Sequence, residues 1–280
     1  MVVHGPSDYE RARAILAVPW WRRLARSPRD LSMGQSSPTL RWFGQPIDPF
    51  DEPWYRFGRV LSLVERCTAI PMNAKWLDVG CQIGQFIKFL QARQQIVAAG
   101  IDDFDEKGVR EICRKYFHIE IKDAGEVFDG SWRYRCRRID KVGFDIDERF
   151  SFVSALEVLE HMIDTDAFLR ECHEHLEAGG HLVISTPNLH SLRNRVKFPF
   201  GGYPSGMEYR TVVHHVRLYN ATVLISHFKE HGFELEAISG VNFLPIKFIR
   251  QGRVTNIDAR LADYAASLCG NIIAVFRAVP

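Results

Sequence analysis

The sequence lacks several features that would assign it to a special structural class. None of its apolar runs approaches the roughly 20 residues needed to span a bilayer. The N-terminus has no charged segment followed by an apolar one, as a secretory signal would. Its six cysteines are scattered without a C-x-x-C pair, and a disulfide framework would be shorter and richer in cysteine. We therefore expect a reduced, cytoplasmic protein without a transmembrane segment.

A dominant charge is also missing. The chain has 36 Lys and Arg residues against 34 Asp and Glu, for a formal net charge of +2. It has no block of like charge, so nothing demands nucleic acid or an acidic membrane as a partner. The hydrophobic share of 46% and the length of 280 residues suit one large globular domain with extensions. These numbers do not indicate an oligomeric state.

Residues 1–53 show little periodicity. They contain several arginines, the pair Trp20 and Trp21, and recurring Pro and Ser over 28–46. We interpret them as an N-terminal extension with a short helix near 8–27. The alternative is a lid or a basic aromatic surface for a lipid headgroup or an anionic substrate. A helix over 54–69 leads into the main domain, which we assign to 54–280.

From Lys75 onward, short apolar runs alternate with helical patterns, which is typical of a parallel sheet with crossover helices. In one helix, Ile83, Phe86, Ile87 and Leu90 share a face. The predicted strands are 75–79, 96–101, 134–139 (with 118–122 as an alternative), 150–155, 181–185, 233–241 and 271–277.

Capping residues position two further helices. Asp164 and Asn220 are expected to cap helices that end at Gly179-Gly180 and at Gly232, respectively. The pattern predicts an α/β, Rossmann-like doubly wound fold. Its sheet would be seven-stranded and mostly parallel, with helices on both faces. Two insertions interrupt it, at 188–219, which we expect to form a substrate loop, and at 242–270.

The segment from Trp76 to Phe86, Trp-Leu-Asp-Val-Gly-Cys-Gln-Ile-Gly-Gln-Phe, has the pattern of a strand, a tight turn and a helix. Glycine allows such a turn to bend, and the amides at a helix start favour an anionic group. Asp78, at the end of the strand, would meet a cationic amine. Asp102, which ends the next strand, lies where an acid accepts hydrogen bonds from ribose hydroxyls.

A nicotinamide or flavin dinucleotide site is the main rival. Its fingerprint is G-x-G-x-x-G, and counted from Gly80 the second and third glycine positions are Gln82 and Gln85. A pyrophosphate needs close backbone approach at the middle position, where Gln82 would stand in its way. A cofactor without phosphate tolerates the bulkier loop.

The same segment resembles motif I of class I S-adenosylmethionine-dependent methyltransferases, D-x-G-C-G-x-G. Four more stretches resemble that family in the same order. They are Gly100–Asp102, Phe150–His161 ending in Glu-Val-Leu-Glu-His, Leu176–Asn188, and His215–Tyr219. The resemblance covers about 75–241 and the last strand. It is greatest to the subgroup of ubiquinone-biosynthesis, sugar and natural-product O-methyltransferases.

The resemblance implies S-adenosyl-L-methionine as cofactor, with S-adenosyl-L-homocysteine as product. The residues that it implies for the cofactor site are Asp78, Gly80, Cys81, Gln82, Gly84, Phe86, Asp102, Asp103, Asp140 and Glu157. Two departures stand out. Gln82 replaces the usual middle glycine, and the third-strand region offers Asp140 as its nearest acid, for which a solvated turn is the alternative.

Two histidines are candidates for a catalytic base. His161 follows the fourth strand at the edge where ligands bind such sheets, and His215 ends the long loop. A structural role for the Glu160-His161 pair is the alternative. The stretch Cys172-His-Glu-His175 does not indicate a metal site, because residues two apart on a helix point to different sides. We therefore predict no metal.

These observations favour transfer of a methyl group to an oxygen of a small molecule, such as a glycan, a lipid-linked compound or a natural product. The Asn/Asp-Pro-Pro-aromatic motif of nucleobase N-methylation is missing after the fourth strand, where the chain reads Ala155-Leu-Glu-Val-Leu-Glu160. Transfer to nitrogen or carbon on the same cofactor stays open. So does a catalytically silent cofactor-binding module, which the departure at Gln82 would favour.

Overall fold

The computed structural model describes residues 41–42, 45–46, 53–139, 143–207, 215–243 and 253–280. Its centre is a seven-stranded sheet, preceded by a short hairpin of β1 (Arg41–Trp42) and β2 (Gln45–Pro46). The strands of the large sheet are β3 (Ala74–Val79), β4 (Ile96–Asp102), β5 (Arg133–Cys136), β6 (Phe150–Leu156), β7 (Leu176–Pro187), β8 (Phe233–Val241) and β9 (Asn271–Ala278).

The strand order is β5-β4-β3-β6-β7-β9-β8. All neighbours are parallel except β9, which runs antiparallel between β7 and β8. The chain builds outward from β3 to β5, then returns to start the other half at β6. The predicted doubly wound, mostly parallel sheet is confirmed, and its topological switch point lies between β3 and β6, where such folds bind ligands.

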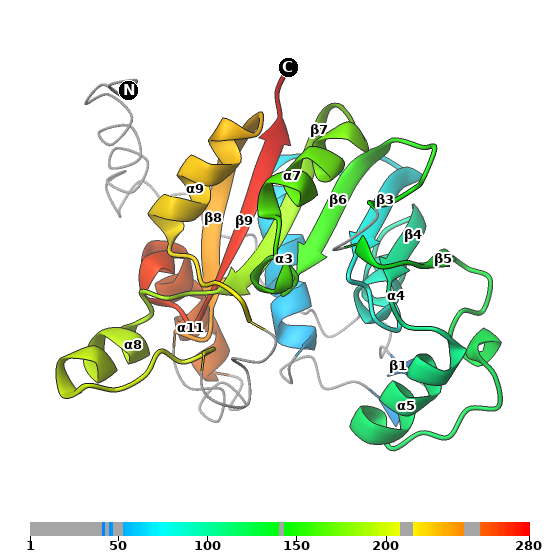
Figure 1. The fold of residues 1–280 in the computed structure, drawn as a ribbon, viewed down its shortest axis with the longest axis horizontal. Helices are drawn as coiled ribbons and strands as arrows, with labels where there is room; N and C mark the ends of the chain where they lie inside the picture. Colours follow the sequence, from blue (N-terminus) through cyan, green and yellow to red (C-terminus); the bar gives the residue numbers. More distant parts are fainter. Residues whose placement is uncertain (1–40, 43–44, 47–52, 140–142, 208–214, 244–252) are drawn as a thin grey trace.

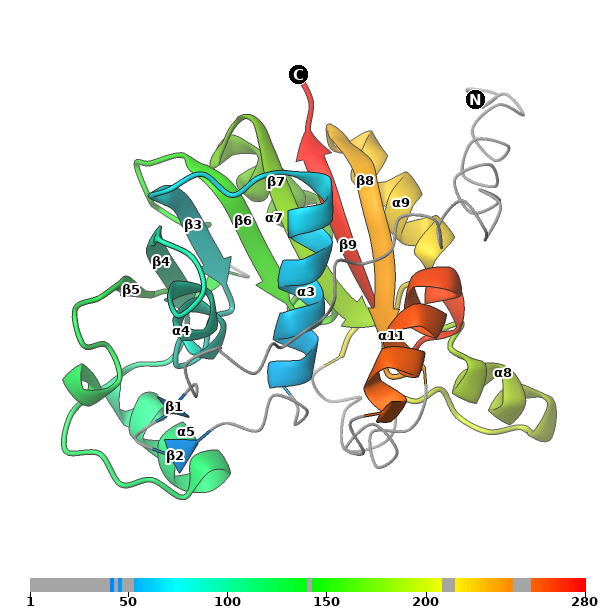
Figure 2. The ribbon, with the colours of Figure 1, turned by 180° about the vertical axis from the view of Figure 1, so that it is seen from behind.

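Helices cover both faces of the sheet (Figures 1 and 2). The face seen in Figure 1 carries α7 (Thr165–Glu174) and α9 (Ala221–Glu230), and the opposite face carries α3 (Trp54–Cys67), α4 (Gln85–Gln91) and α11 (Arg253–Tyr264). The helix α5 (Glu106–Phe117) lies near the β4–β5 edge. Within the described ranges, no helix combines the length and the apolar character needed to cross a bilayer.

Alternation along β3 explains which side chains meet which helices. Leu77 and Val79 are fully buried in the cluster that includes α7 and α9. Trp76 is fully buried in the cluster that includes α3 and α4. Asp78 is two residues beyond Trp76, so its side chain lies on the α3 side of the sheet. This placement brings the N-terminal turn of α3 over the carboxyl end of β3.

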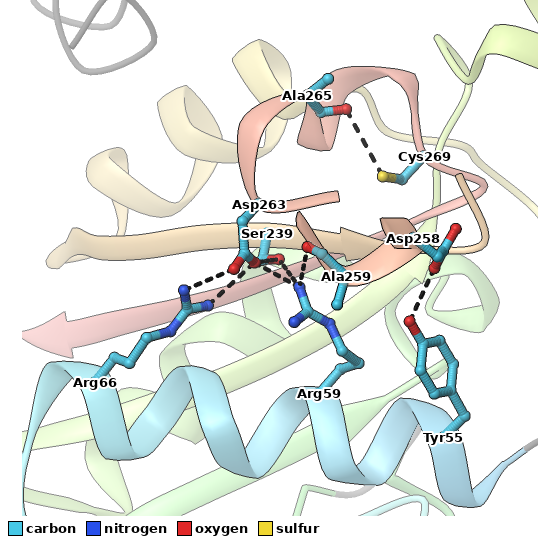
Figure 3. Close-up of polar contacts among 9 residues, drawn as sticks. All are labelled: Tyr55, Arg59, Arg66, Ser239, Asp258, Ala259, Asp263, Ala265 and Cys269. Carbon is cyan, nitrogen blue, oxygen red and sulfur yellow. Dashed lines mark hydrogen bonds and ion pairs between the residues drawn. The ribbon is translucent and has the colours of Figure 1, made fainter. Parts of the chain in front are cut away.

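Polar contacts fasten α3 to α11, which is distant in sequence (Figure 3). Tyr55 donates a hydrogen bond to Asp258 Oδ2 at 2.9 Å. Arg59, only 3% exposed, pairs with Asp263 Oδ1 at 2.5 Å, and Arg66 pairs with Oδ2 of the same carboxylate at 2.8 Å. Each contact joins residues about 200 positions apart, so the placement of α3 depends on the C-terminal part of the chain.

Several element bounds differ from the sequence predictions. We predicted that the Asp164-capped helix would run to Gly179-Gly180, which is wrong, because it ends at Glu174 and β7 begins at Leu176. Both glycines lie within β7, so they mark an irregular strand and not a helix end. The third strand occupies Arg133–Cys136 and therefore starts and ends earlier than 134–139.

Both predicted insertions contain helices. The first holds α8 (Leu192–Lys197) and the short turn η3 (Phe198–Phe200), and the second holds α11 and η4 (Ala266–Leu268). The helix of the first insertion projects away from the sheet (Figure 1). The predicted helix near 8–27 lies outside the described residues.

Candidate functional site

A cavity of about 570 Å³ opens at the carboxyl ends of β3 and β6, at the switch point of the sheet. Its wall comes from the start of α3, the turn after β3, the start of α4, one face of α5, and the end of β6. The lining residues are Pro53, Arg56, Phe57, Asp78, Gly80, Cys81, Gln82, Gln85, Phe86, Phe104, Gly108, Glu111, Ile112, Lys115, Leu156 and Glu157. The volume is that of a pocket for a small molecule or a cofactor.

Asp78 is the buried acid of this cavity. Ser154 donates a hydrogen bond to its Oδ1 at 2.6 Å, and the indole of Trp76 donates to Ser154 Oγ at 2.9 Å. Burial raises the pKa of Asp78 to about 7, although the Ser154 hydrogen bond opposes the shift and the nearby Asp102 adds to it. A buried acid with a pKa near neutrality is stabilised as a carboxylate when a cation binds beside it.

The turn after β3 is held by hydrogen bonds within the protein. The amides of Gly80 and Cys81 both donate to Ile101 O, at 2.8 and 3.2 Å. The amide of Gln82 donates to Asp102 Oδ2 at 2.7 Å. These amides are therefore already paired, so anion recognition by the turn, which we expected from the sequence, would have to use other donors.

Gln82 has a left-handed backbone, with a φ of 48°. Glycine adopts this conformation without steric cost, whereas a residue with a Cβ atom loses on the order of 1–2 kcal/mol. This explains why the related motif carries glycine at this position. The hydrogen bond to Asp102 holds Gln82 in place, so the departure from the motif changes the side chain and keeps the turn.

Gly84 has a different role from the one expected. It caps α4 with a φ of 75° and is not among the residues that line the cavity. A Cβ atom at Gly84 would lie 2.2 Å from Trp132 Cζ2, in an indole that is only 5% exposed. Close packing against Trp132 therefore accounts for a glycine at position 84.

Glu157 is held by side chains from α3, β7 and β9. Its Oε1 accepts a hydrogen bond from Ser185 Oγ at 2.7 Å and lies 3.1 Å from an Arg56 nitrogen. Its Oε2 accepts from Asn271 Nδ2 at 2.7 Å. Glu157 also has a left-handed backbone, with a φ of 59°. The ion pair connects α3 to the end of β6, and both of its side chains line the cavity.

The two candidate histidines lie against each other. The rings of His161 and His215 pack edge to face with their centroids 4.7 Å apart. His215 Nδ1 lies 2.7 Å from Gly206 O, so it carries the proton and leaves Nε2 as the basic atom of the neutral ring. Glu160, next to His161, is 1% exposed, and burial raises its pKa to about 8. Ligand-type atoms of Glu160, His161 and His215 lie within 4.8 Å of one another.

The other sequence candidates have varied positions. Cys81 lines the cavity, and burial raises the pKa of its thiol, so it is not set up as a nucleophile. Asp102 is 8% exposed and holds the turn, Asp103 is exposed beside it, and neither lines the cavity. Asp140 lies outside the described residues.

Sequence reasoning missed six residues that line the cavity with charged, polar or aromatic groups: Arg56, Phe57, Gln85, Phe104, Glu111 and Lys115. Gln85 follows the motif glycine directly, so the motif context could have identified it. Arg56 is in the first turn of α3, before the motif. Only the tertiary packing of α3 brings Arg56 to the site, so no local pattern identifies it.

Comparison with known proteins identifies the family of this chain. A family model described as a methyltransferase domain matches residues 54–238. The ubiquinone biosynthesis O-methyltransferase of Idiomarina loihiensis is 26% identical over 74% of this chain and 80% of its own length. The mitochondrial ubiquinone biosynthesis O-methyltransferase of Homo sapiens is 28% identical over 61% of this chain.

The chain spans 40 to 63% of the length of four such O-methyltransferases, from Homo sapiens, Bos taurus, Bradyrhizobium and Nitrobacter winogradskyi. Among solved structures, phosphoethanolamine N-methyltransferase 2 of Haemonchus contortus in complex with S-adenosyl-L-methionine has a similar fold. It is 15% identical, with a TM-score of 0.55 over 91% of this chain and 60% of that one. The chain therefore belongs to the methyltransferase-domain family and has the class I fold of S-adenosylmethionine-dependent methyltransferases.

Proposed function

We propose that this chain binds S-adenosylmethionine in the cavity at the switch point and transfers its methyl group to an oxygen of a small molecule. The observation that supports this most strongly is buried Asp78, whose pKa of about 7 lets it ionise beside a cationic ligand. Gln85 supports it as well. Its Nε2 is buried and has no hydrogen-bond partner among the described residues, so it can donate to a carboxylate.

The remaining lining residues suit the other parts of the cofactor. Arg56 would pair with the carboxylate, since the amides of the turn are already used. Phe104 and Ile112 offer apolar contacts to a base. Asp102 does not line the cavity, but it lies at the end of the neighbouring strand β4, where it would accept hydrogen bonds from ribose hydroxyls. When bound, S-adenosylmethionine supplies an electrophilic methyl group on a sulfonium.

The chain's own contribution is to position the acceptor, exclude water and accept one proton. The acceptor oxygen would bond to the methyl carbon as the bond from that carbon to sulfur breaks, which leaves S-adenosylhomocysteine. The hydroxyl proton would pass to the His161–His215 pair. His215 suits this role because its Nδ1–H donates to the Gly206 carbonyl, so that Nε2 is the proton-accepting atom of the neutral ring. His161, four residues beyond cavity-lining Glu157, would orient that ring or accept the proton itself.

For the acceptor, we propose a lipid-linked compound. The projecting segment of α8 and η3 exposes Val196 (58%), Phe200 (87%) and nearby Tyr203 (60%), next to basic Arg193 and Arg195. Exposed apolar and basic side chains together suit the surface of a membrane or a micelle. The O-methyltransferase names of the relatives are consistent with a hydroxyl acceptor. We also propose a reducing compartment such as the cytoplasm, because all six cysteines are free thiols.

The first experiment is calorimetric titration of the chain with S-adenosylmethionine, S-adenosylhomocysteine and NAD. We expect micromolar binding of the first two and none of the third. Asp78→Asn should weaken binding of S-adenosylmethionine at least about 10-fold, because a buried charge partner is lost. The exposed carboxylate variant Glu120→Gln is the control. Binding of NAD alone, or equal binding by Asp78→Asn, would contradict the assignment.

Methyl transfer needs its own assay. Transfer of labelled methyl would be measured to two acceptors with the same aromatic hydroxyl head, one with a hydrophobic tail and one without. We expect the tailed acceptor to have the higher kcat/KM and His215→Gln to lower kcat with little change in cofactor affinity. If the chain binds S-adenosylmethionine but methylates neither acceptor, nor amine analogues of them, the result would favour a catalytically silent cofactor-binding module.

A further inference from the structure

A second cluster of chemically capable side chains lies away from the cavity, where α7 packs beside α9. Asp166 is in the first turn of α7, His227 is in the last turn of α9, and His231 is the residue that follows α9. One ligand-type atom from each lies within 4.8 Å of the others. His227 Nε2 is 2.8 Å from Asp166 Oδ1, and His231 Nε2 is 3.7 Å from the same oxygen. We propose that this cluster binds a divalent transition metal of the zinc class.

Hydrogen bonding fixes the tautomer of His231. Its Nδ1 lies 2.9 Å from the backbone carbonyl of His227. A carbonyl only accepts, so Nδ1 carries a proton, and the neutral ring directs the lone pair of Nε2 toward Asp166. Two acceptors then face each other at 3.7 Å. A bridging water or a bound cation can lie between them, and a metal satisfies both lone pairs at once.

His227 can take the tautomer that a metal needs. Its Nδ1 lies 3.0 Å from the hydroxyl of Tyr219, which is 4% exposed. Because a tyrosine hydroxyl both donates and accepts, it supports His227 with a proton on either nitrogen. With Nδ1–H donating to Tyr219, Nε2 is released from Asp166 and becomes a ligand. Histidines that bind metals are commonly held in this way by an oxygen partner on the other nitrogen.

The spacing fits a small tetrahedral ion. Zinc ligands at roughly 2.0–2.1 Å from the metal are about 3.4 Å apart. The two histidine–Asp166 pairs, at 2.8 and 3.7 Å, lie on either side of that value, so each needs a shift of well under 1 Å. Asp166 is 60% exposed, so water can supply a fourth ligand. The hydrogen bond with His227 is the main cause that lowers the pKa of Asp166, and the charge of Arg170 acts in the same direction.

The position of the cluster suggests what the metal does. His161 precedes Asp166 by five residues, and His215 precedes Tyr219 by four, so both sides of the cluster continue into the segments that carry the histidine pair. Arg217 adds a contact between the same segments by donating to Thr165 Oγ1 at 2.8 Å. A metal that joins α7 to α9 would hold these two segments in register.

The test is a zinc titration of the full chain against a competing chromogenic chelator at near-neutral pH. Cys136→Ser would serve as background, because an exposed thiol is a competing ligand for zinc. His161→Gln in the same background tests whether zinc binds instead to the other group of possible ligands, Glu160, His161 and His215. His181→Gln is the matched control, since His181 pairs with a single carboxylate, Glu236, at 3.0 Å.

We expect one zinc equivalent whose affinity falls at least about 10-fold in His231→Gln and in His227→Gln, and stays unchanged in His181→Gln and His161→Gln. Tyr219→Phe keeps the packing and should weaken binding by roughly 10-fold. This variant keeps the test valid if a histidine variant fails to fold. Cobalt substitution should give the visible absorption of a tetrahedral site. Zinc binding that is absent, or that is equal in His227→Gln, His231→Gln and the control variants, would overturn the proposal.

Discussion

The contact between α3 and α11 allows a sharp comparison, because one carboxylate, Asp263, pairs with two arginines in different environments. Arg59 is 3% exposed, and it also donates to Ser239 Oγ at 2.7 Å and to Ala259 O at 3.2 Å. Arg66 is 37% exposed. Breaking a buried pair typically costs about 3–5 kcal/mol, whereas an exposed pair contributes about 0–1 kcal/mol.

We therefore predict that Arg59→Met lowers the free energy of unfolding by about 3 kcal/mol, at the lower end of that range because Asp263 keeps Arg66 and is 22% exposed. Arg66→Met, with the same new side chain, should cost no more than about 1 kcal/mol. In a thermal scan, the first variant should lose roughly 6–12 °C and the second less than about 4 °C.

The assay is urea unfolding followed by circular dichroism, with thermal scans as a second measurement. The double variant Arg59→Met/Asp263→Asn should lose less than the sum of its single variants, because it removes the uncompensated carboxylate together with its partner. Equal losses for Arg59→Met and Arg66→Met would refute the reasoning, since burial would then not determine the cost.

Three further predictions concern the cavity. Because the pKa of Asp78 is higher in the folded protein than in the unfolded chain, Asp78 stabilises the unliganded fold at pH values below the pKa of the unfolded chain. This contribution is lost as the pH rises through about 7. S-adenosylmethionine affinity should instead rise about 10-fold between about pH 6 and about pH 8. Asp78→Asn should reduce both trends, as scans and calorimetry across pH would show, and the remainder would come from Asp102, whose pKa burial also raises to about 7. Gln82→Gly should raise the free energy of unfolding by less than about 1 kcal/mol, because relief of the left-handed backbone offsets the added entropy of the unfolded chain. A loss of more than about 1 kcal/mol in urea unfolding would contradict this prediction. Gly84→Ala should cost roughly 2–5 kcal/mol in the same assay, because it meets both a left-handed backbone and the Trp132 ring, and a neutral result would refute the packing argument.

Local signals predicted much of the fold. Asp164 and Asn220 cap their helices as expected, with their side chains accepting from Ala167 N and Val223 N. A cap needs only the residues within one turn, so it is readable from the sequence. The glycine pair before His181 misled us, because glycine ends helices and also occurs in irregular strands, and only pairing with β6 decides between the two.

The candidate site was predictable where one chain segment supplies it. The motif from Asp78 to Phe86 supplied six of the predicted cofactor residues, and five of these six line the cavity. The position of Arg56 at the site and the contact between His161 and His215 were not predictable. Each joins segments whose approach depends on the whole fold. The left-handed backbone of Gln82 was not predictable either, since glutamine has no preference for it.

The α3–α11 contacts also constrain the order in which the molecule is assembled. During synthesis, α3 emerges about 200 residues before the partners that hold it, so it cannot take its final position until Asp258 and Asp263 have left the ribosome. The first turn of α3 forms one wall of the cavity through Arg56 and Phe57. A nascent chain would thus carry an unfinished pocket, and competence to bind a ligand would arise as one of the last events of folding.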